Sequence, residues 1–553
     1  KIYDKIWRYA DVEDFFYAGL ATFCANVIFF VFTRIFMVKM SPRMHFIFLL
    51  TSMSSIVVFR LIYRINRLID NVSGEDEIGK KRMLIVGAGE STALLLREMF
   101  KYSGNKYTPV AIADDDREKI GRKIMGVRVE GNTTEIPDLC EKFKVDVILF
   151  SITSISLSQR RKILDICAKT NLEVRIIPNM YEVLTSGTSL NSAIRKIKVE
   201  DLLGREPIIF DKKRYGGYIT GKTVMVTGGG GSIGSELCRQ IAELGCKRLI
   251  ILDVYENSAY QIQQELRMKY GKDFNLGVEI ATICDKKELE EIFSSENVDV
   301  VFHAAAHKHV PLMENNPEEA VKNNVFGTLN LIECADKFKV KKFVQISTDK
   351  AVNPTNIMGA TKRICEMLVQ MKNKESETEF VAVRFGNVLG SNGSVIPLFE
   401  EQIKKMGPVT VTHPDIIRYF MTIPEAVSLV LTAGGFANGG EIFVLDMGDP
   451  VKIKDLAENL IRLSGFVPGE DIKIEYTGLR PGEKLYEELL MDEEGIQKTK
   501  NHKIYIGKPI SMDINELKEQ LSKLRTICAR GSREDVEAML LRIVPTFKHI
   551  KLK

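Results

Sequence analysis

The chain has 553 residues, of which 45% are hydrophobic and 27% are charged, and its formal net charge is only +4. This length allows two to four domains with large apolar cores, and so small a net charge argues against nucleic acid as a partner. The nine cysteines are scattered and form no Cys-x-x-Cys pair. We therefore expect buried thiols in a reducing compartment, with neither a disulfide framework nor a metal site.

Residues 1–70 are predicted to anchor the chain in a membrane as a transmembrane helical hairpin. Residues 15–33 carry no charge and are long enough to cross a hydrocarbon core as a helix, whereas residues 46–59 form a shorter second span or an interfacial segment. Basic residues before the first stretch and after the second predict that both ends face the cytoplasm. A buried helical hairpin without a membrane is the alternative. Because the chain begins with Lys1, we expect residues to precede it in the natural protein.

After a polar linker at residues 71–80, strands alternate twice with helix-length segments, which is typical of parallel α/β sheets. Residues 81–203 are predicted as a degenerate Rossmann-like domain, and residues 204–221 as an interdomain connection. Residues 222–553 are predicted as the catalytic domain, with a substrate-binding lobe from about Gly386 onward. The expected fold class is α/β, with two doubly wound Rossmann-like sheets behind the membrane hairpin. The strands are expected at 83–86, 145–150, 174–177, 223–227, 248–253, 278–283, 298–302, 342–346 and 380–385.

A glycine-rich turn marks the expected cofactor site of the second unit. Gly228, Gly231 and Gly234 follow an apolar strand and precede a helix expected near Ser235, with Ser232 and Ile233 inside the motif. Glycines let the backbone approach a pyrophosphate, and the helix N-terminus supplies free N–H donors. The sequence therefore predicts a dinucleotide at this turn.

Two acidic residues extend this expected site. Asp253 ends the next strand, where a carboxylate binds ribose hydroxyls and repels a 2′-phosphate, so NAD is expected rather than NADP. Asp285 follows a further strand and is expected near the adenine.

A weaker turn, with Gly87, Gly89 and Thr92, opens the first unit and is followed by Asp114. Threonine at the third position makes the approach of helix and strand less close. Nucleotide binding and a purely structural role both remain open for this turn.

The predicted catalytic segment is Ser347-Thr348-Asp349-Lys350, at the carboxyl end of a strand, where ligands of open α/β sheets bind. Further on stand Met358 and Lys362, spaced like the Tyr-x-x-x-Lys pair of the extended short-chain dehydrogenase/reductases, which this sequence resembles. A thioether cannot replace the tyrosine as a base. Either the fold is noncatalytic, or the base has moved. The neighbouring Asp349 and Lys350 favour the second interpretation, because a 4,6-dehydratase needs an acid and a base besides hydride transfer.

The runs at 303–311, 347–362, 384–391 and 478–484 resemble the bacterial membrane-bound UDP-N-acetylglucosamine 4,6-dehydratases. The resemblance implies that Lys350 is the base at carbon 5, with its pKa depressed by Lys362 and the nicotinamide ring. It implies that Asp349 is the acid for the leaving hydroxyl and that Thr348 binds the hydroxyl on carbon 4. Methionine at 358 is similar to the branch that retains the configuration at carbon 5.

The same resemblance supplies the remaining site residues. Ala304 and Ala305 are expected at the cofactor, and Arg418 and Arg480 at the diphosphate, which paired donors bind well. Glu483 is expected to orient Arg480. The other expected substrate contacts are Lys308, His309, Asn387, Ser391, Val409 and Thr410.

The implied product is a UDP-4-keto-6-deoxy-N-acetyl sugar for bacterial glycan or glycoprotein synthesis of the bacillosamine type. The expected location is the bacterial inner membrane, in contact with its lipid, with the catalytic domain on the cytoplasmic side and the chain in a homo-oligomer. The alternatives are a noncatalytic, membrane-tethered nucleotide sensor or scaffold, a dehydratase that inverts carbon 5, and a UDP-sugar 4-epimerase. The missing tyrosine counts against the epimerase.

Overall fold

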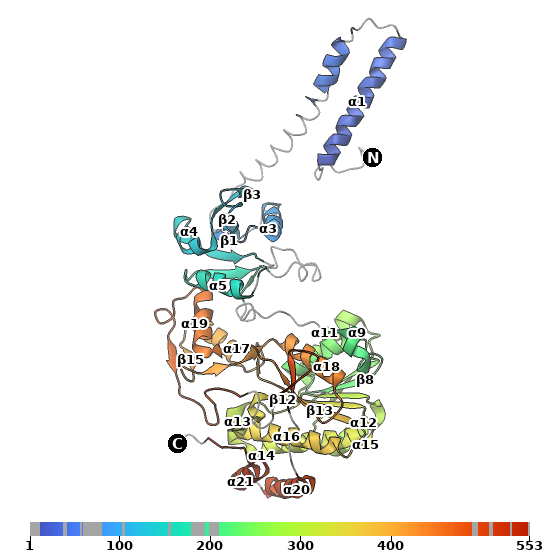
Figure 1. Cartoon of the computed structure of the whole chain (residues 1–553), viewed down its shortest axis with the longest axis vertical. Coiled ribbons are helices and arrows are strands. Elements are labelled where there is room, and N and C mark those ends of the chain that lie inside the picture. The colour runs from blue at the N-terminus through green and yellow to red at the C-terminus, as the bar shows by residue number, and fades with distance from the viewer. Residues whose placement is uncertain are drawn as a thin grey trace. The chain divides into compact units, whose positions relative to one another are not determined.

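The computed structural model of the chain divides into two compact units (Figure 1). The smaller unit contains residues 1–132, 141–153 and 177–194, and the larger contains residues 133–140, 154–176 and 195–553. The structure describes residues 12–36, 41, 43–52, 54–55, 58, 80–101, 106–152, 155, 157–177, 194–197, 210–488, 496–507, 513–530 and 533–550. Most of the expected linker and the first part of the expected connection at 204–221 lie outside these residues, as do the basic residues expected to orient the hairpin.

Helix α1 (Val12–Ile35) contains the first apolar stretch. Polar side chains interrupt that stretch and face residues 43–52: the Asn26 amide donates to Ser52 Oγ at 3.1 Å, and the Thr33 hydroxyl lies 2.8 Å from His45 Nε2. In the part of the chain that the structure describes, no helix has both the length and the apolar character needed to cross a membrane. The predictions of a transmembrane hairpin and of an inner-membrane location are therefore wrong.

The first α/β sheet has seven strands in the order β3-β4-β2-β1-β5-β6-β7. Strand β1 pairs in parallel with β2 and β5, and its residues 83–86 are buried. Its strands are β1 (Lys81–Val86), β2 (Tyr107–Ala113), β3 (Lys123–Ile124), β4 (Val127–Gly131), β5 (Val147–Phe150), β6 (Glu173–Ile176) and β7 (Arg195–Lys196). The helices between them are α3 (Glu90–Lys101), α4 (Ile136–Lys142) and α5 (Leu157–Ala168), with a 3-10 turn at Thr133–Glu135.

The second sheet has nine strands in the order β10-β9-β8-β11-β12-β13-β18-β22-β21. Its parallel part is β8 (Thr223–Thr227), β9 (Arg248–Asp253), β10 (Leu276–Ile280), β11 (Val300–His303), β12 (Lys342–Thr348), β13 (Glu379–Phe385) and β18 (Ile442–Leu445). Strands β21 (Ile496–Lys498) and β22 (Ile504–Gly507) add an antiparallel edge. The chain turns from one side of β8 to the other between β10 and β11, and ligands of such sheets bind at this point of reversal.

Helices cover both faces of this sheet, which explains why its central strands are almost continuously apolar. Alternate residues of one strand enter different cores: Met225 packs on one face and Val224 on the other. Figure 1 shows α12 (Lys286–Glu296), α15 (Thr328–Lys337) and α16 (Ile357–Asn373) together on one side. Helices α10 (Ser232–Glu243), α11 (Glu256–Tyr270) and α18 (Ile423–Phe436) pack against the core of the opposite face. The α/β prediction is confirmed.

A smaller lobe follows β13 and is held together by short strand pairs around its own apolar core. Its elements are β14 (Asn387–Val388), α17 (Val395–Lys404), β15 (Val409–Val411), β16 (Ile417–Arg418), β17 (Phe420–Met421), β19 (Val451–Lys452), α19 (Ile453–Leu463) and β20 (Ile474–Tyr476). The remaining short elements of the second unit are α9 (Lys212–Tyr215), α13 (Val310–Asn315), α14 (Pro317–Ala320), a 3-10 turn at Gly216–Tyr218, a π-helical turn at Val321–Gly327 and η5 (Asp349–Ala351).

Helix α16 is buried on all sides through residue 371. Helices α20 (Ile514–Arg530) and α21 (Arg533–Ile543) add leucines to the core that contains it. The segment after α21 contacts the residues that precede α16: Lys548 N donates to Pro354 O at 2.8 Å, and Ile550 N donates to Thr355 O at 3.2 Å. The helix that carries Met358 and Lys362 is thus fixed from every direction.

Candidate active site

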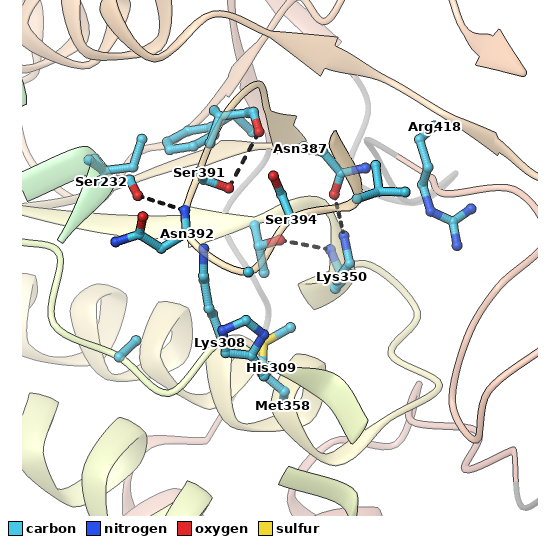
Figure 2. Close-up of a pocket in the computed structure, with 18 of the residues that line it drawn as sticks. Ser232, Lys308, His309, Lys350, Met358, Asn387, Ser391, Asn392, Ser394 and Arg418 are labelled. Atoms are coloured by element: carbon cyan, nitrogen blue, oxygen red, sulfur yellow. Dashed lines mark hydrogen bonds between the residues drawn. The ribbon is translucent and has the colours of Figure 1, made fainter. Parts of the chain in front are cut away.

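A cavity of about 590 Å³ lies at the carboxyl ends of β8, β11, β12 and β13 and is closed on the other side by the smaller lobe. This is the size of a pocket for one or two small ligands. It brings together most residues that the sequence singled out (Figure 2). The predicted residues that line it are Gly228, Gly231, Ser232, Ile233, Gly234, Ala304, Lys308, His309, Thr348, Lys350, Met358, Lys362, Asn387, Ser391, Thr410, Arg418, Arg480 and Glu483.

The glycine turn forms one end of the cavity, and α10 begins at Ser232, three residues before the expected start. Gly228 has φ +67°, and a Cβ there would lie 2.7 Å from Ala305 N. At Gly230, a Cβ would lie 2.6 Å from Ser258 Cβ. Side chains at these positions would push apart the backbone segments that form the turn, so the glycines keep backbone N–H groups within reach of a ligand.

The two acidic residues of the expected cofactor site differ in their surroundings. Asp253, at the end of β9, accepts hydrogen bonds from Gly230 N at 2.8 Å and Tyr255 N at 2.9 Å, so its carboxylate belongs to the glycine turn. Asp285 caps α12 by accepting from Lys287 N and Glu288 N. Capping gives Asp285 a structural role that the sequence interpretation did not consider. Neither residue is among those that line the cavity.

The segment predicted to be catalytic lies at the end of β12, beside the cavity. The Thr348 hydroxyl donates to Asp349 Oδ1 at 2.8 Å, and Lys350 Nζ donates to the same oxygen at 3.0 Å and to Asn387 Oδ1 at 3.2 Å. Thr348 and Lys350 line the cavity, whereas the Asp349 side chain is 1% exposed and lies behind them. A Cβ on Gly386 would lie 3.0 Å from Asp349 Oδ2, so the glycine leaves room for this carboxylate.

A buried ion pair supports the end of β12 from below. Arg384 Nε and Nη2 donate to the two oxygens of Glu366 at 3.0 and 2.8 Å, and both side chains are 0% exposed. Ser347 Oγ donates to Glu366 Oε1 at 2.7 Å. Burial raises the pKa of Glu366, but Arg384 and Arg363 lower it more strongly, so the net shift is downward. Ser347, the residue before Thr348, is therefore hydrogen-bonded to an ion pair between α16 and β13.

Met358 occupies the first turn of α16 and faces the cavity with its thioether, which offers no group for proton transfer. One turn later, Lys362 Nζ donates to Ile346 O at 2.6 Å. Burial lowers the pKa of Lys362, and the neighbouring Cys365 and Glu366 offset only part of this effect. Lys362 is therefore held beside the strand that carries Thr348.

The lobe residues form the other wall. Arg418 donates to Ile417 O, Leu485 O and Lys484 O, and its Nη2 lies 3.3 Å from Glu483 Oε1. Its guanidinium is thus held largely by the protein itself. The other carboxylate oxygen of Glu483 accepts from the backbone N–H of Arg480 at 3.0 Å, so Glu483 holds the Arg480 loop and the Arg418 side chain together.

The remaining predicted contacts fall on both sides of the cavity. Lys308 and His309 line it, and burial lowers the pKa of each. The Ser391 loop meets the glycine turn, because Asn392 N donates to Ser232 Oγ at 3.1 Å. Val409 is buried in the lobe core and does not line the cavity, whereas Thr410 does.

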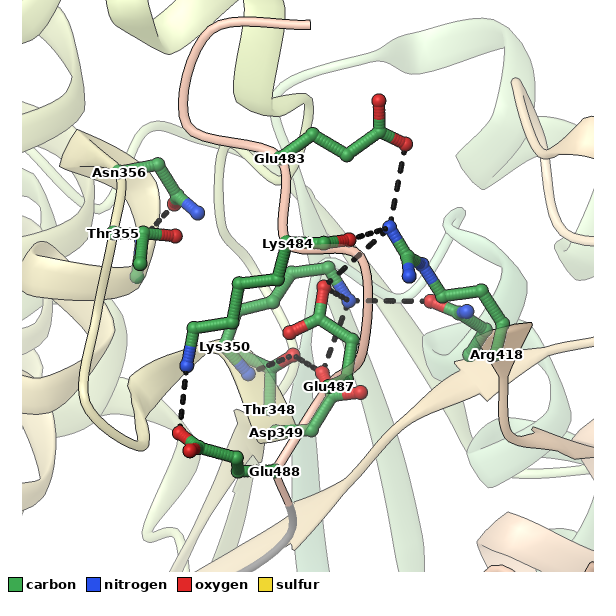
Figure 3. A network of polar contacts seen from close by, with 12 residues as sticks. Thr348, Asp349, Lys350, Thr355, Asn356, Arg418, Glu483, Lys484, Glu487 and Glu488 are labelled. Atoms are coloured by element: carbon green, nitrogen blue, oxygen red, sulfur yellow. Dashed lines mark hydrogen bonds and ion pairs between the residues drawn. The ribbon is translucent and has the colours of Figure 1, made fainter. Parts of the chain in front are cut away.

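The sequence analysis did not single out Glu487, a buried carboxylate that lies beside Lys350. Glu487 has 4% side-chain exposure, and its Oε1 lies 3.8 Å from Lys350 Nζ and 3.9 Å from Arg418 Nη2 (Figure 3). Burial and the Asp349 charge raise the pKa of Glu487, although Lys350 and Arg418 act against this. Its sequence neighbourhood offered only a weak signal, namely its place three residues after the run at 478–484.

Two carboxylates surround Lys350 and act on its pKa. Burial lowers the pKa of Lys350, but Asp349 and Glu487 raise it, and the net shift is upward. The side chain lies between two carboxylates, and both favour its protonated form.

The turn of the first unit is built differently. Gly87 has φ +105°, and Ala88 N donates to Asp114 Oδ2 at 2.6 Å, much as Gly230 does to Asp253. The Thr92 hydroxyl, which stands at the third glycine position, donates to Gly87 O and lies 2.7 Å from Ser151 Oγ. Threonine thus fastens the turn to the helix with a hydrogen bond.

Comparison with known proteins assigns the catalytic unit to a family. The sequence model described as "Polysaccharide biosynthesis protein" matches residues 224–509, which include every residue of the cavity. The chain is 47% identical over 513 residues to the capsular polysaccharide biosynthesis protein CapD of Staphylococcus aureus, covering 92% of this chain and 84% of that protein. The chain belongs to the polysaccharide biosynthesis protein family.

This polysaccharide biosynthesis protein is also similar to a second polysaccharide biosynthesis protein and to a nucleotide-sugar epimerase. The probable polysaccharide biosynthesis protein EpsC of Bacillus subtilis is 47% identical over 484 residues, covering 86% of this chain and 81% of that protein. The UDP-glucose 4-epimerase of Rickettsia canadensis is 38% identical over 280 residues, covering 49% and 79%. The X-ray structure of Pen from Bacillus thuringiensis matches with 38% identity and a TM-score of 0.49, covering 53% and 90%.

A second sequence model, described as "CoA-binding domain", matches residues 2–178 of this polysaccharide biosynthesis protein. The match includes the turn at Gly87. Nucleotide binding and a structural role therefore both remain open for the first unit.

Proposed function

We propose that the protein is a NAD-dependent 4,6-dehydratase that acts on UDP-N-acetylglucosamine and retains the configuration at carbon 5. The observation that carries this proposal is the group formed by Thr348, Asp349 and Lys350 beside Met358. Removal of water from a sugar requires a base at carbon 5 and an acid at the leaving hydroxyl, and this group contains a carboxyl and an amine that share one hydrogen bond. A 4-epimerase requires neither of them.

The glycine turn fits the cofactor. Gly228 and Gly230 have no side chains, and the space left free lets backbone N–H groups face a pyrophosphate. The Asp253 carboxylate is fixed beside the turn. Gly228, Gly231, Ser232, Ile233 and Gly234 would hold the pyrophosphate, and Lys362 the nicotinamide ribose. When bound, NAD supplies a place to store the hydride between its removal from carbon 4 and its return to carbon 6.

The residues of the chain supply the proton transfers. Thr348 binds the hydroxyl on carbon 4, and its hydrogen bond to Asp349 gives the proton of that hydroxyl a path to the carboxylate. Lys350, in its neutral form, removes the proton from carbon 5. Asp349 then protonates the hydroxyl that leaves carbon 6. Lys350 finally returns its proton to carbon 5, on the same face, which retains the configuration.

Product analysis in deuterium oxide tests the proposal. We expect purified protein to convert UDP-N-acetylglucosamine to a 4-keto-6-deoxy product with deuterium at carbon 5, with no net consumption of NAD, and NMR reports both the elimination and the configuration. The Lys350→Ala variant should bind NAD normally and incorporate no deuterium. Recovery of a carbon 4 epimer without loss of water would contradict the proposal, as would the absence of any conversion.

The second candidate is a UDP-sugar 4-epimerase, which the similarity to the Rickettsia enzyme favours. The Asp349–Lys350 pair weakens it, because an epimerase needs neither a base at carbon 5 nor an acid at the carbon 6 hydroxyl. The same experiment separates the two candidates through the fate of the carbon 6 hydroxyl.

A further inference from the structure

The proposed reaction does not by itself explain how Lys350 loses its proton before it acts as a base. Asp349 and Glu487 keep the side chain protonated, yet a base at carbon 5 must start without that proton. The side chain is 18% exposed, so release of the proton to water would leave a net negative charge in a poorly hydrated site. A nearby carboxylate that accepts the proton avoids this cost.

Asp349 cannot be that acceptor throughout the reaction. In the proposed function, on which this inference rests, Asp349 holds the proton of the carbon 4 hydroxyl until water leaves carbon 6. During the same interval Lys350 must be neutral in order to attack carbon 5. Two protons therefore have to be stored at the same time, and one carboxyl group stores only one.

Glu487 is the second carboxyl group at Lys350. Its Oε1 lies 3.8 Å from Lys350 Nζ, and Figure 3 shows its side chain turned toward Lys350 and Arg418. Neither Glu487 Oε2 nor Asp349 Oδ2 has a hydrogen-bond partner among the described residues, although both atoms are buried. An unpartnered buried carboxylate oxygen is costly, and binding a proton lowers that cost.

We propose that Glu487 stores the proton of Lys350, so that the lysine enters the reaction neutral while the buried cluster keeps its net charge. When rotation of the two side chains shortens the 3.8 Å separation between Lys350 Nζ and Glu487 Oε1 to hydrogen-bond distance, the ammonium proton moves to the Glu487 carboxylate, which gives a neutral amine and a neutral carboxylic acid. Asp349 stays negative and Arg418 stays positive. Lys350 then takes the proton from carbon 5 and gives back to carbon 5 one of its ammonium hydrogens, which exchange with solvent, so the Glu487 carboxyl group stays protonated through repeated turnovers. Glu487 is a positioning residue, because it acts through Lys350.

Other charged groups face Lys350 and Glu487 from the neighbouring elements, but they do not take the place of Glu487 as the proton acceptor. Arg418 approaches from β16, and Glu483 and Lys484 from the loop that carries Glu487. Glu483 is occupied by Arg418 Nη2 and the Arg480 N–H, and Lys484 Nζ donates to Glu488 Oε2 at 2.8 Å.

The pH dependence of turnover tests this inference. In the wild-type enzyme the proton stays inside the cluster, so the rate of 4-keto product formation should be nearly independent of pH around neutrality. In Glu487→Gln the proton of Lys350 has to go to solvent. The rate should fall at least about tenfold at neutral pH and rise about tenfold per pH unit toward alkaline values, until Lys350 is deprotonated. The Glu487→Asp variant, which keeps a carboxyl group, should restore the flat profile at a reduced rate.

The matched control is Glu488→Gln, which removes the same charge at the next residue. The Glu488 side chain is 50% exposed and pairs with Lys484, so the rate and the pH profile should stay those of the wild type. A uniform loss of rate in Glu487→Gln with an unchanged profile would overturn the inference, as would a wild-type rate. If the wild-type protein makes no dehydrated product, the proposed function fails instead, so the two failures are distinguishable.

Discussion

The buried Glu366 carboxylate gives the sharpest prediction for stability. The Glu366→Gln substitution conserves the shape of the side chain and removes its charge, while Arg384 remains fully buried and Arg363 nearly so. Breaking a buried ion pair by neutralising one partner costs about 3–5 kcal/mol, because the remaining charge is left uncompensated. At about 1.4 °C per kcal/mol for a unit of about 330 residues, the melting temperature of the catalytic unit should fall by about 4–7 °C.

Differential scanning fluorimetry of the full chain measures this change. The control is Glu265→Gln, because Glu265 pairs with Arg239 at 2.7 Å but its side chain is 49% exposed, and such a pair contributes less than about 1 kcal/mol. Equal melting temperatures for the two variants would refute the reasoning. Since Ser347 also donates to Glu366, Glu366→Gln should slow product formation even at temperatures where it is folded.

Three further predictions concern the proton-transfer group and the segment behind it. Asp349→Asn should abolish both hydride removal and elimination, a loss of about 10²–10⁴-fold, and appearance of reduced cofactor at the normal rate would contradict this. Gly386→Ala places a methyl group 3.0 Å from Asp349 Oδ2 and should lower kcat more than KM for UDP-N-acetylglucosamine, whereas an unchanged kcat would show that the carboxylate tolerates displacement. The pKa of His549 is raised by Glu314 and Glu537 against the effect of burial, so its contribution to stability is complete below the unfolded pKa of about 6.5 and is lost as the pH rises through the higher folded value. Denaturant midpoints across that range should show this loss in the wild type and not in His549→Ala.

Much of the catalytic fold follows from local sequence patterns. The strands at Thr223–Thr227 and Arg248–Asp253 are confirmed residue for residue, because apolar runs bounded by turn residues are strong signals in a parallel sheet. The strand expected at 278–283 is shifted and occupies Leu276–Ile280, because Asp285 caps the next helix and the residues between serve as the connection. The membrane prediction rested on the absence of charge in residues 15–33, but no helix among the described residues is both long and apolar enough to cross a membrane.

The site was harder to predict than the fold. Residues that follow β12 could be predicted, since the carboxyl ends of parallel strands meet at one edge. Glu487 could not, because it lies on an irregular loop far along the chain and reaches Lys350 only through tertiary packing. The carboxylates that raise the pKa of Lys350 could not be predicted for the same reason, since the sequence does not show which carboxylates face it.

The burial of α16 has a consequence for the order in which the protein matures. Met358 and Lys362 belong to a helix whose covering layer is α20 and α21, and whose preceding residues are bound by Lys548 and Ile550. On the ribosome these covering residues emerge long after the catalytic segment, and domains fold as units once their chain is available. Helix α16 therefore lacks part of its covering core until translation has passed residue 550, so its final packing is reached only near the end of synthesis.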